Sequence, residues 1–428
     1  MPDWDVIVIG GGAAGLLAAA RAAERGRRTL LVEKNDRPGV KILMSGGTRC
    51  NLTHDCDARG IIDAFGTQGK FLHSALAVLG PRELVNLIEA EGVPTKVEET
   101  GKVFPVSDKA TDVLAALLRR LERSGCQVAL GEPVRSLELS SESCRVVTAT
   151  RSLTAEHVVI TTGGQSYPGS GTTGDGYAWA KKLGHTIVPP RPALVPLTVD
   201  ASWVPGLRGL TVPDAGLRVV AADGKCLAET RGSLLFAHFG LSGPTALDIS
   251  RVVSDWALHE AKRDGKGDAT PTSGLRSDAR LRIVCDFLPT WTVAAIDEHL
   301  RQSAASAGKR SVANLLPEEL PRRLAALLPE LACVDAGRRA AELSKADRAR
   351  LVTAVKELSI ALTGTLGFKK AEVTAGGVAL SEVDSRTMRS KLVPRLYLAG
   401  EVLDLDGPIG GYNFQAAFST GWLAGESV

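Results

Sequence analysis

Residues 5–15 read Asp-Val-Ile-Val-Ile-Gly-Gly-Gly-Ala-Ala-Gly, and an alanine-rich run continues to Ala23. This pattern predicts a buried strand, a tight turn and a helix. Gly10, Gly12 and Gly15 have the G-x-G-x-x-G spacing of a turn that binds a nucleotide pyrophosphate. The first glycine permits the turn, the second permits close approach of the phosphates, and the third packs the helix on the strand. The free N–H groups at the helix start add a partial positive charge.

A second apolar strand is predicted at residues 29–32, and it ends in Glu33, eighteen positions after Gly15. An acid near this point binds a ribose 2′-hydroxyl and disfavours a 2′-phosphate. The order of strand, glycines, helix, strand and acid therefore favours the ADP-ribose part of FAD or NAD over NADP. Glycine turns between a strand and a helix also form for packing alone, and these residues leave that alternative open.

The composition indicates an ordinary globular protein with more than one domain. Its 428 residues exceed a single hydrophobic core, and 44% are hydrophobic and 23% charged. The formal net charge of +3 is small for this length and does not indicate a nucleic acid or an anionic membrane as partner. The seven cysteines include no C-x-x-C pair, and the histidines are dispersed. We therefore expect no disulfide framework, no metal site, no membrane span and a cytoplasmic location.

The segment from Ser45 to Asn51 is chemically dense. Ser45 and Gly46 suit close backbone approach to a flat ligand. Arg49, Cys50 and Asn51 carry groups that hydrogen-bond the polar edge of a ring. The alternative is a surface turn whose Cys50 is simply buried, and composition alone does not choose between the two.

A second G-x-G-x-x-G match lies at Gly169–Gly174. It does not directly follow a predicted strand, since the nearest one ends at Ile160, and no strand-end acid stands about twenty residues further on. We interpret it as a loop around the first ligand, held by Asp175, and the alternative is a separate NAD site.

The domain organisation follows from changes in pattern. Pro189–Pro192 marks a boundary, after which short β-prone segments continue to Cys285 and helical periodicity begins near Trp291. The expected parts are a nucleotide-binding domain (1–190 and 370–428), a β-rich substrate or cap domain (191–288 and 352–369) and a helical insert (289–351).

Several features of the inserted segments allow more than one interpretation. His238 is either a general acid–base or a structural histidine, and it is our candidate for a catalytic residue. The pairs Arg322-Arg323 and Arg338-Arg339 are either an anion-binding patch or a solvated face, and nearby acids such as Glu318 favour the face. Residues 259–279, rich in charge, Gly, Ser and Thr, predict a mobile loop.

The end of the chain supplies partners for its beginning. Leu396-Tyr-Leu-Ala-Gly-Glu401 is an apolar strand ending at a Gly-acid turn, and a glycine loop then opens a helix. Together with Gly10–Gly15, this segment resembles FAD proteins of the glutathione-reductase-like two-half superfamily. More narrowly, Ser45–Asn51, Phe239–Pro244 and Gly400–Gln415 are similar to a bacterial flavoprotein family that includes aminoacetone oxidase and a flavoprotein of bile-acid metabolism.

The resemblance implies an α/β fold with a discontinuous Rossmann-like FAD domain (a parallel sheet with helices), an inserted β-rich domain and a small helical domain. It also implies noncovalent FAD. The implied cofactor-binding residues are Gly10, Gly12 and Gly15 at the pyrophosphate; Glu33 at the adenosine ribose; Val134 at the adenine; Ser45, Gly46, Arg49, Cys50 and Asn51, with Thr162 and Gly163 nearby, around the flavin; Glu401, Gly411, Tyr412 and Asn413 at the ribityl and pyrimidine end; and Ala13, Ala14, Lys34, Lys41 and Gly400 as further cofactor-binding residues. This chain departs from the family in having Thr48 where a glycine is usual.

These observations favour an FAD-dependent oxidoreductase that oxidises an amine or reduces an enone or ketone at the flavin N5, with NAD(P)H as a transient electron donor in the reductase case. Nucleic acid and membrane are not expected as partners, and the oligomeric state is not indicated. The alternative is a flavin-containing scaffold protein, RNA-associated through its helical insert. The near-neutral net charge speaks against that alternative.

Overall fold

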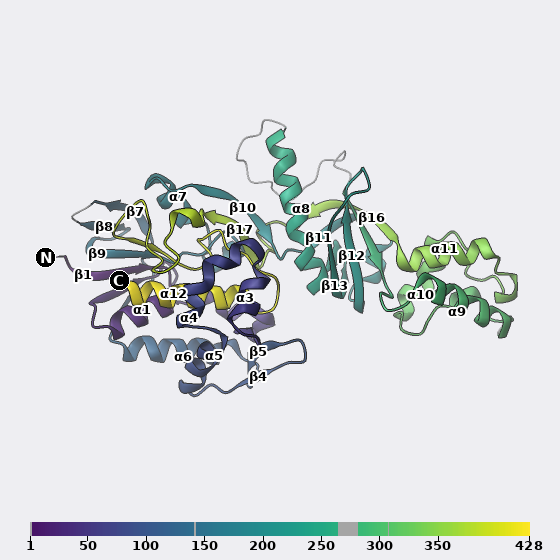
Figure 1. Cartoon of the computed structure of the whole chain (residues 1–428), viewed down its shortest axis with the longest axis horizontal. Helices are drawn as coiled ribbons and strands as arrows, with labels where there is room; N and C mark the ends of the chain where they lie inside the picture. Colours follow the sequence, from purple (N-terminus) through teal and green to yellow (C-terminus); the bar gives the residue numbers. More distant parts are fainter. Residues whose placement is uncertain (1, 141–142, 264–280, 307) are drawn as a thin grey trace. The chain divides into compact units, whose positions relative to one another are not determined.

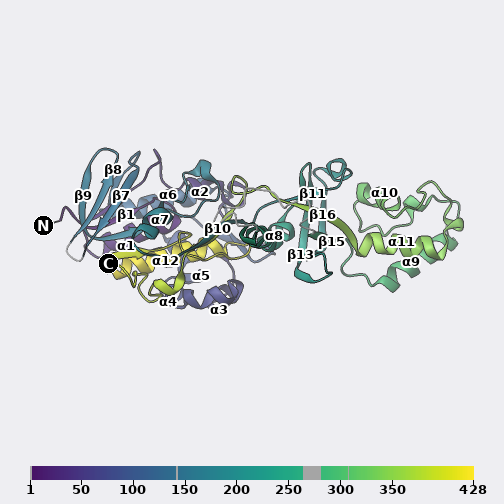
Figure 2. The same cartoon turned by 90° about the horizontal axis from the view of Figure 1, so that it is seen from above.

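The computed structural model describes residues 2–140, 143–263, 281–306 and 308–428. The chain forms two compact units: unit 1 comprises Met1–Pro192 and Phe368–Val428, and unit 2 comprises Ala193–Gly367. Figures 1 and 2 show a helix-covered sheet in unit 1, and a barrel with helices in unit 2. The predicted fold class, a discontinuous Rossmann-like domain with an inserted β-rich part and a helical part, is confirmed. The finer division into three domains stays a prediction.

The main sheet of unit 1 is built around β1, whose residues Val6–Ile9 are all buried. Its strands are, in spatial order, β6 (Gln127–Ala129), β2 (Thr29–Val32), β1 (Trp4–Ile9), β9 (Ser152–Ile160), β8 (Cys144–Thr148) and β7 (Val134–Leu139), with β18 (Leu396–Leu398) paired to β9. β6, β2, β1, β9 and β18 run parallel, as expected, whereas β7–β8–β9 form an antiparallel arm. The sheet contains both parallel and antiparallel pairs because β9 is long enough to pair with different strands along its length. It pairs with β8 through Ser152–Ala155 and with β18 through Val158–Ile160.

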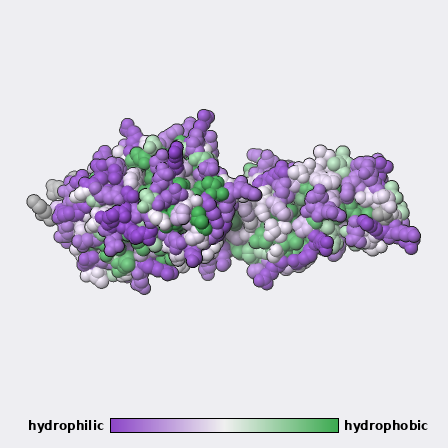
Figure 3. Space-filling model, turned by 90° about the horizontal axis from the view of Figure 1, so that it is seen from below, coloured by the Kyte–Doolittle hydropathy of each residue, from purple (hydrophilic) through white to green (hydrophobic). Residues whose placement is uncertain are grey.

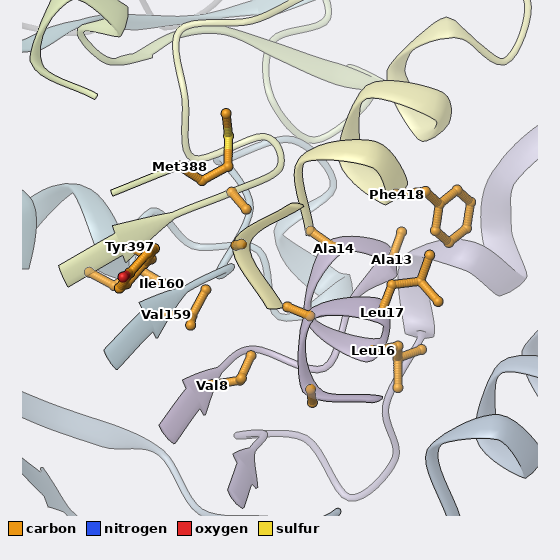
Figure 4. Close-up of a cluster of buried hydrophobic side chains, with 14 of the residues drawn as sticks. Val8, Ala13, Ala14, Leu16, Leu17, Val159, Ile160, Met388, Tyr397 and Phe418 are labelled. Atoms are coloured by element: carbon orange, nitrogen blue, oxygen red, sulfur yellow. The ribbon is translucent and has the colours of Figure 1, made fainter. Parts of the chain in front are cut away.

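Two helices from opposite ends of the chain pack tightly on this sheet. α1 (Ala13–Glu24) and α12 (Tyr412–Ser427) meet where β-carbons at Gly421 and Gly425 would overlap the carbonyl oxygens of Ala14 and Ala18. A spacing of four residues places both glycines on one helix face. Figure 4 shows the neighbouring core, with Leu16, Leu17 and Phe418 drawn from these helices and Val8, Val159 and Tyr397 from the strands. This packing brings the C-terminal segment to the first glycine turn.

The other elements of unit 1 surround this core. They are α2 (Val40–Met44), η1 (Ser45–Thr48), β3 (Thr53–His54), α3 (Ala58–Ala64), η2 (Gly66–Leu72), α4 (His73–Val78), α5 (Pro81–Ala90), β4 (Thr95–Val97), β5 (Lys102–Pro105), α6 (Ala110–Arg123), η3 (Pro168–Ser170), α7 (Asp175–Lys182), β10 (Ile187–Ala193), β17 (Val373–Val378) and η7 (Leu380–Glu382). β3, β5 and β4 form a small antiparallel sheet, and β10 pairs with β17.

Unit 2 contains a closed barrel with the strand order β11-β14-β13-β12-β15-β16. The elements are β11 (Leu197–Asp200), η4 (Val204–Leu207), β12 (Thr211–Val220), β13 (Cys226–Ala237), β14 (Gly240–Ser242), α8 (Pro244–Arg263), β15 (Arg282–Asp286), α9 (Val293–Ser306), η5 (Val312–Asn314), α10 (Arg322–Leu331), η6 (Ala340–Glu342), α11 (Lys345–Lys356) and β16 (Leu358–Thr365). Barrel residues such as Phe236 and helix residues such as Leu324 and Leu351 share one buried cluster.

Two boundaries in unit 2 differ from those expected. α11 continues through Lys356, past the expected end of the helical insert at residue 351, because Leu351, Val352 and Val355 keep a buried helical face. Of the segment 259–279 predicted as a mobile loop, residues 259–263 lie in α8, and residues 264–279 lie outside the described residues.

Candidate flavin site

The first glycine turn has three distinct steric environments. Gly10 has φ +104°, and a β-carbon there would lie 2.7 Å from the carbonyl oxygen of Thr161. A β-carbon at Gly15 would overlap the carbonyl oxygen of Gly10. A β-carbon at Gly12, in contrast, would meet no atom of the described residues within 4 Å. The outer two glycines are therefore required by packing, and the middle one leaves room for a ligand, as the pyrophosphate motif demands.

The helix that follows this turn begins in a way that suits an anion. Gly12 is the N-cap of α1, and the first turn of the helix, from Ala13 and Ala14 onward, has no acidic residue. The buried hydroxyl of Thr162 has no hydrogen-bond partner among the described residues and faces Gly176 of α7, where a β-carbon would lie 2.3 Å away. The next residue, Gly163, has φ +72°. A helix start without an acid and without a side-chain cap fits a bound pyrophosphate.

Glu33 lies at the end of β2 and is buried. Its two carboxylate oxygens accept hydrogen bonds from the backbone N–H groups of Gly11 (2.6 Å) and Asn35 (2.8 Å). The carboxylate is thus fixed against the glycine turn, with lone pairs remaining for a ribose hydroxyl. The backbone N–H of Glu132 donates to the carbonyl of Glu33 (3.0 Å), which places the segment leading to Val134 next to this acid.

The second glycine loop packs against the residues that follow Glu33. The Lys34 ammonium donates to the Thr173 hydroxyl and pairs with Asp175, both at 2.6 Å. The Asn35 side chain donates to the carbonyl of Ser170 (3.1 Å). Gly169–Gly174 therefore flanks the first turn, and α7 begins with Asp175 in its first turn.

The Gly400-Glu401 turn meets α1 from the C-terminal part of the chain. A β-carbon at Gly400 would lie 2.8 Å from that of Ala14. The Glu401 carboxylate pairs with Lys41 and accepts hydrogen bonds from the Ser166 hydroxyl (2.7 Å) and the Thr374 backbone N–H (2.9 Å). The sequence interpretation missed Ser166 and Thr374, because a hydroxyl and an amide separated by about two hundred residues leave no spacing signal.

The segment Ser45–Asn51 folds into an unusual loop. The backbone N–H of Cys50 donates to the Ser45 carbonyl (3.1 Å) and closes a turn. In this turn Gly46, Gly47 and Thr48 have φ of 55°, 67° and 70°. Three successive left-handed residues are rare, and for a β-branched threonine the conformation is strained. Burial raises the pKa of the Cys50 thiol to about 12, so Cys50 is a neutral, packed side chain and not a nucleophile.

Arg49 turns toward the small sheet. Its guanidinium lies 4.0 Å from the ring centre of Phe104 and donates to Glu98 (2.6 Å). Asp108, 3.5 Å away, adds a second carboxylate. Arg49 is therefore held by stacking and charge, with its side chain 37% exposed.

The start of α12 closes the site. With its amide oriented to satisfy both groups, Asn51 donates to the Thr53 carbonyl and accepts from the Gly411 N–H, each at 3.0 Å. Asn413 accepts from the Gly407 N–H (2.8 Å) and donates to the Gly407 carbonyl (2.9 Å), which fixes the loop before the helix. Gly411 is itself required, because a β-carbon there would overlap the Thr53 backbone.

A histidine that the sequence interpretation missed stacks on this helix start. The rings of His54 and Tyr412 lie 4.8 Å apart at 18°, and Nδ1 of His54 lies 3.2 Å from the Gly410 carbonyl oxygen. A carbonyl only accepts, so Nδ1 carries the proton in this contact. The sequence signal was its place three residues after Asn51, inside the dense segment.

Comparison with known proteins identifies the family. Residues 4–427 match the family model described as HI0933-like protein Rossmann domain. The chain belongs to this family. It is 32% identical to the ribosomal RNA dihydrouridine synthase of Escherichia coli strain K12, with 100% of this chain and 98% of that protein covered. It is also 32% identical to the 3-dehydro-bile acid delta(4,6)-reductase of Clostridium scindens, with 98% of each chain covered.

The fold likeness extends to a solved steroid enzyme. The 3-ketosteroid delta1-dehydrogenase of Sterolibacterium denitrificans aligns with a TM-score of 0.51 at 14% identity, covering 99% of this chain and 98% of the other. At that identity the likeness shows the fold alone. With the family established, this HI0933-like protein is an FAD-dependent oxidoreductase. Its glycine turn and the start of α1, which has no acid and no side-chain cap, fit the cofactor.

The predicted cofactor residues of this HI0933-like protein all lie in unit 1, where contacts join Glu33 to the glycine turn, Gly400 to Ala14, Glu401 to Lys41, and Asn51 to Gly411. Their contacts with FAD stay predictions. His238 lies in unit 2, exposed in the β13–β14 turn, where it packs edge-on against Phe239 (5.0 Å, 76°) without a hydrogen bond to another described residue. A catalytic role for His238 also stays a prediction.

Two further findings concern the described residues only. No group of three or more His, Cys, Asp or Glu side chains among them is arranged to hold a metal ion. No helix in the described ranges has the length and apolar character needed to cross a membrane.

Proposed function

We propose that this HI0933-like protein is a reductase of a carbon–carbon double bond conjugated to a carbonyl group, and that its substrate is a uracil base in RNA. The observation that carries the proposal is the end-to-end similarity to the E. coli protein named ribosomal RNA dihydrouridine synthase. A second protein of that name, from Haemophilus influenzae, is 31% identical over 99% of this chain.

The two relatives with different substrates support one reaction type. Dihydrouridine is uridine whose 5,6 double bond, conjugated to the C4 carbonyl, has been saturated. The name of the Clostridium enzyme describes reduction of double bonds on a 3-oxo steroid ring system. In both cases a hydride adds to a carbon at the far end of a system conjugated with a carbonyl (the β carbon in uridine), negative charge develops on the carbonyl oxygen, and a proton then adds to carbon. This reaction class favours the reductase alternative over amine oxidation.

The residues of unit 1 suit the parts of this reaction that the protein supplies. When bound, FAD supplies the hydride, and NAD(P)H is the proposed source of its electrons. Gly12 and the start of α1 hold the pyrophosphate, and Lys41 with Glu401 orients the middle of the cofactor. The start of α12, with no acid in its first turn, would offer a positive helix end to the pyrimidine end of the flavin. The neutral Cys50 thiol is a buried packing group of the Ser45–Asn51 loop.

The test compares substrates under anaerobic conditions. The holoprotein is first reduced with NADPH or NADH while the flavin absorbance at about 450 nm is followed. In vitro transcribed bacterial ribosomal RNA, a 3-oxo-4,6-diene bile acid or a small amine is then added. We expect the RNA to gain dihydrouridine, measured by mass spectrometry of its digested nucleosides, while the diene stays unchanged.

The outcomes separate the alternatives. Reduction of the diene without dihydrouridine would replace RNA by a steroid-like substrate and keep the reaction class. Flavin bleaching by an amine, with none by NAD(P)H, would reject the reductase assignment. A flavin that neither donor reduces would favour the scaffold alternative. The Gly12→Val variant, expected to lack FAD, is the control for turnover by contaminants.

A further inference from the structure

Basic side chains gather at one end of the helical part of unit 2. Two segments, 308–312 and 338–341, run antiparallel there. The Val312 N–H donates to the Arg338 carbonyl (3.0 Å), and the Ala340 N–H donates to the Arg310 carbonyl (2.8 Å). An isolated bridge pairs Ser311 with Arg339. The pairs Lys309-Arg310 and Arg338-Arg339 are thereby brought side by side although they lie almost thirty residues apart in the sequence.

α11 begins next to this ladder and adds Lys345 at its first position. The other end of α11 lies elsewhere, since Lys356 donates to the carbonyl of Trp291 at the start of the helical part. A helix of this length separates its two ends by about 16 Å. We call Lys309, Arg310, Arg339 and Lys345 the basic tip.

The acids around the basic tip are mostly engaged by other groups. Asp347 pairs with Arg338 (2.8 Å) and Arg350, and the Ser344 hydroxyl donates to it. Asp297 pairs with Arg348 (2.9 Å). Asp335 accepts from the N–H of Gly337 in its own turn (2.9 Å). Asp335 and Glu342 are therefore left as exposed acids beside the tip that no cation neutralises, in the part of the chain that the structure describes.

The four cations of the basic tip are exposed, and none has an ion-pair partner among the described residues. Some arginines of unit 2 are paired, for example Arg231 with Asp214 and Arg218 with Glu357, each at 2.7 Å, whereas Arg208, Arg322 and Arg323 are exposed without an ion-pair partner among the described residues. Figure 3 shows hydrophilic side chains over much of the helical part of unit 2. The basic tip is set apart because its four unpaired cations lie on two adjacent chain segments and the helix start beside them.

This arrangement is unfavourable for the protein alone. Because Ser311 stands opposite Arg339, Lys309 and Arg339 are diagonal neighbours on the ladder, about 7–8 Å apart, and like charges so placed repel, although more weakly than a directly opposed pair. A lysine in the first turn of a helix also opposes the helix dipole. A chain of phosphates removes both penalties, because each phosphate neutralises a cation and releases counterions.

We propose that the basic tip is a docking surface for the phosphate backbone of RNA. The inference rests on the proposed function, since it supplies the contact that would hold an RNA substrate. A membrane surface is the less suitable partner. The exposed large apolar side chain of unit 2 among the described residues, Val293, stands at the start of α9, away from the tip, whereas membrane binding combines cations with apolar anchors.

The experiment compares two charge variants of the holoprotein. One carries Lys309→Gln, Arg310→Gln and Arg339→Gln, which removes positive charge without introducing repulsion. The control carries Arg82→Gln, Lys181→Gln and Lys182→Gln, three exposed cations of unit 1 that have no ion-pair partner among the described residues. Binding to fluorescently labelled in vitro transcribed ribosomal RNA is measured by anisotropy at several KCl concentrations, together with FAD content, thermal melting and dihydrouridine yield.

We expect the tip variant to bind RNA at least tenfold more weakly at low salt. The slope of log Kd against log salt should fall by about 2 to 3, since each lost phosphate contact removes about 0.7 to 0.9. The control variant should stay within twofold of the wild type. FAD content, melting temperature and NADPH-driven bleaching without RNA should be unchanged in both variants.

The experiment distinguishes a failure of the docking surface from a failure of the proposed function. If the wild type forms dihydrouridine and the tip variant matches it in affinity, slope and yield, the docking surface is wrong and the proposed function stands. If the wild type forms none but binds RNA through the tip, the proposed function is wrong and the surface stands. If the wild type does not bind RNA, the docking surface is rejected outright.

Discussion

Two loops of unit 1 share the G-x-G-x-x-G spacing, yet the structure gives their glycines opposite surroundings. At Gly10 and Gly15 an added β-carbon would collide with backbone atoms, which do not move aside. At Gly171 and Gly174 it would meet the side chains of Asn35 and Gln165. The first loop is constrained by the main chain, and the second is lined by replaceable side chains.

The helices that follow the two loops, α1 and α7, also begin differently. α1 has no acid in its first turn, whereas α7 begins with Asp175, whose carboxylate pairs with Lys34. A carboxylate at a helix start occupies the place where a phosphate would bind. Spacing alone therefore does not define a nucleotide site. The combination of a turn fixed by backbone contacts, a middle glycine with open space, and a helix start without an acid does.

The largest effect is expected at Gly15. Gly15→Ala places a β-carbon on the Gly10 carbonyl oxygen, so β1 or α1 must shift. We expect a loss of about 3 kcal/mol or more of unfolding free energy, as for severe overpacking. Thermal melting and soluble yield measure it.

Gly12→Ala is the control for this substitution, because its β-carbon points into open space among the described residues. A Gly15→Ala protein that melts with the wild type would show that the turn is less rigid than the structure indicates.

The next effect separates the two loops directly. Gly12 and Gly169 are matched, since a β-carbon at either meets no described atom within 4 Å. Gly12→Val should fill the phosphate space and weaken FAD binding at least tenfold, about 1.4 kcal/mol. Gly169→Val should leave FAD content unchanged. The ratio of flavin to protein absorbance after gel filtration measures both, and equal FAD content in the two variants would contradict the assigned position of the pyrophosphate.

The sequence predicted the parts of the fold that depend on local pattern. The strand, turn and helix at residues 4–24, and the return of the Gly400-Glu401 turn to the same place, follow from apolar runs and glycine positions. The antiparallel arm β7–β8 was not predicted, because an apolar strand pattern does not tell which neighbour a strand will choose.

The site was predictable only where a residue type has a fixed role. Glu33 was placed correctly at a strand end, next to the turn. The clamp of Ser166 and Thr374 on Glu401 was not, because each contact joins residues far apart in sequence. Net charge was also a poor guide, since +3 for the whole chain hides the unpaired cations of the basic tip.

The Ser45–Asn51 loop provides a smaller test, which measures the cost of the left-handed backbone conformation at Thr48. Thr48 has φ +70°, a conformation that costs a β-branched residue about 1–2 kcal/mol. Thr48→Gly should relieve this strain, partly offset by the greater freedom of glycine in the unfolded chain. We expect the melting temperature to rise by about 2 °C.

Thr48→Ala is the matched control, because it removes the hydroxyl and methyl but keeps the β-carbon. It should raise the melting temperature less than Thr48→Gly does. An equal rise in both variants would assign the effect to the side chain and not to the backbone.

The smallest effect is expected at Asp175. Its pair with Lys34 is largely exposed, with side-chain exposures of 41% and 30%, so Asp175→Asn should cost no more than about 1 kcal/mol. The variant also tests whether the Asp175 carboxylate by itself prevents nucleotide binding at the Gly169–Gly174 loop. We expect one FAD per chain and no saturable binding of ADP-ribose in a calorimetric titration, because Asn35 and Gln165 still fill the space beside Gly171 and Gly174. A second equivalent of nucleotide would mean that charge, and not the shape of the loop, distinguishes the two glycine motifs.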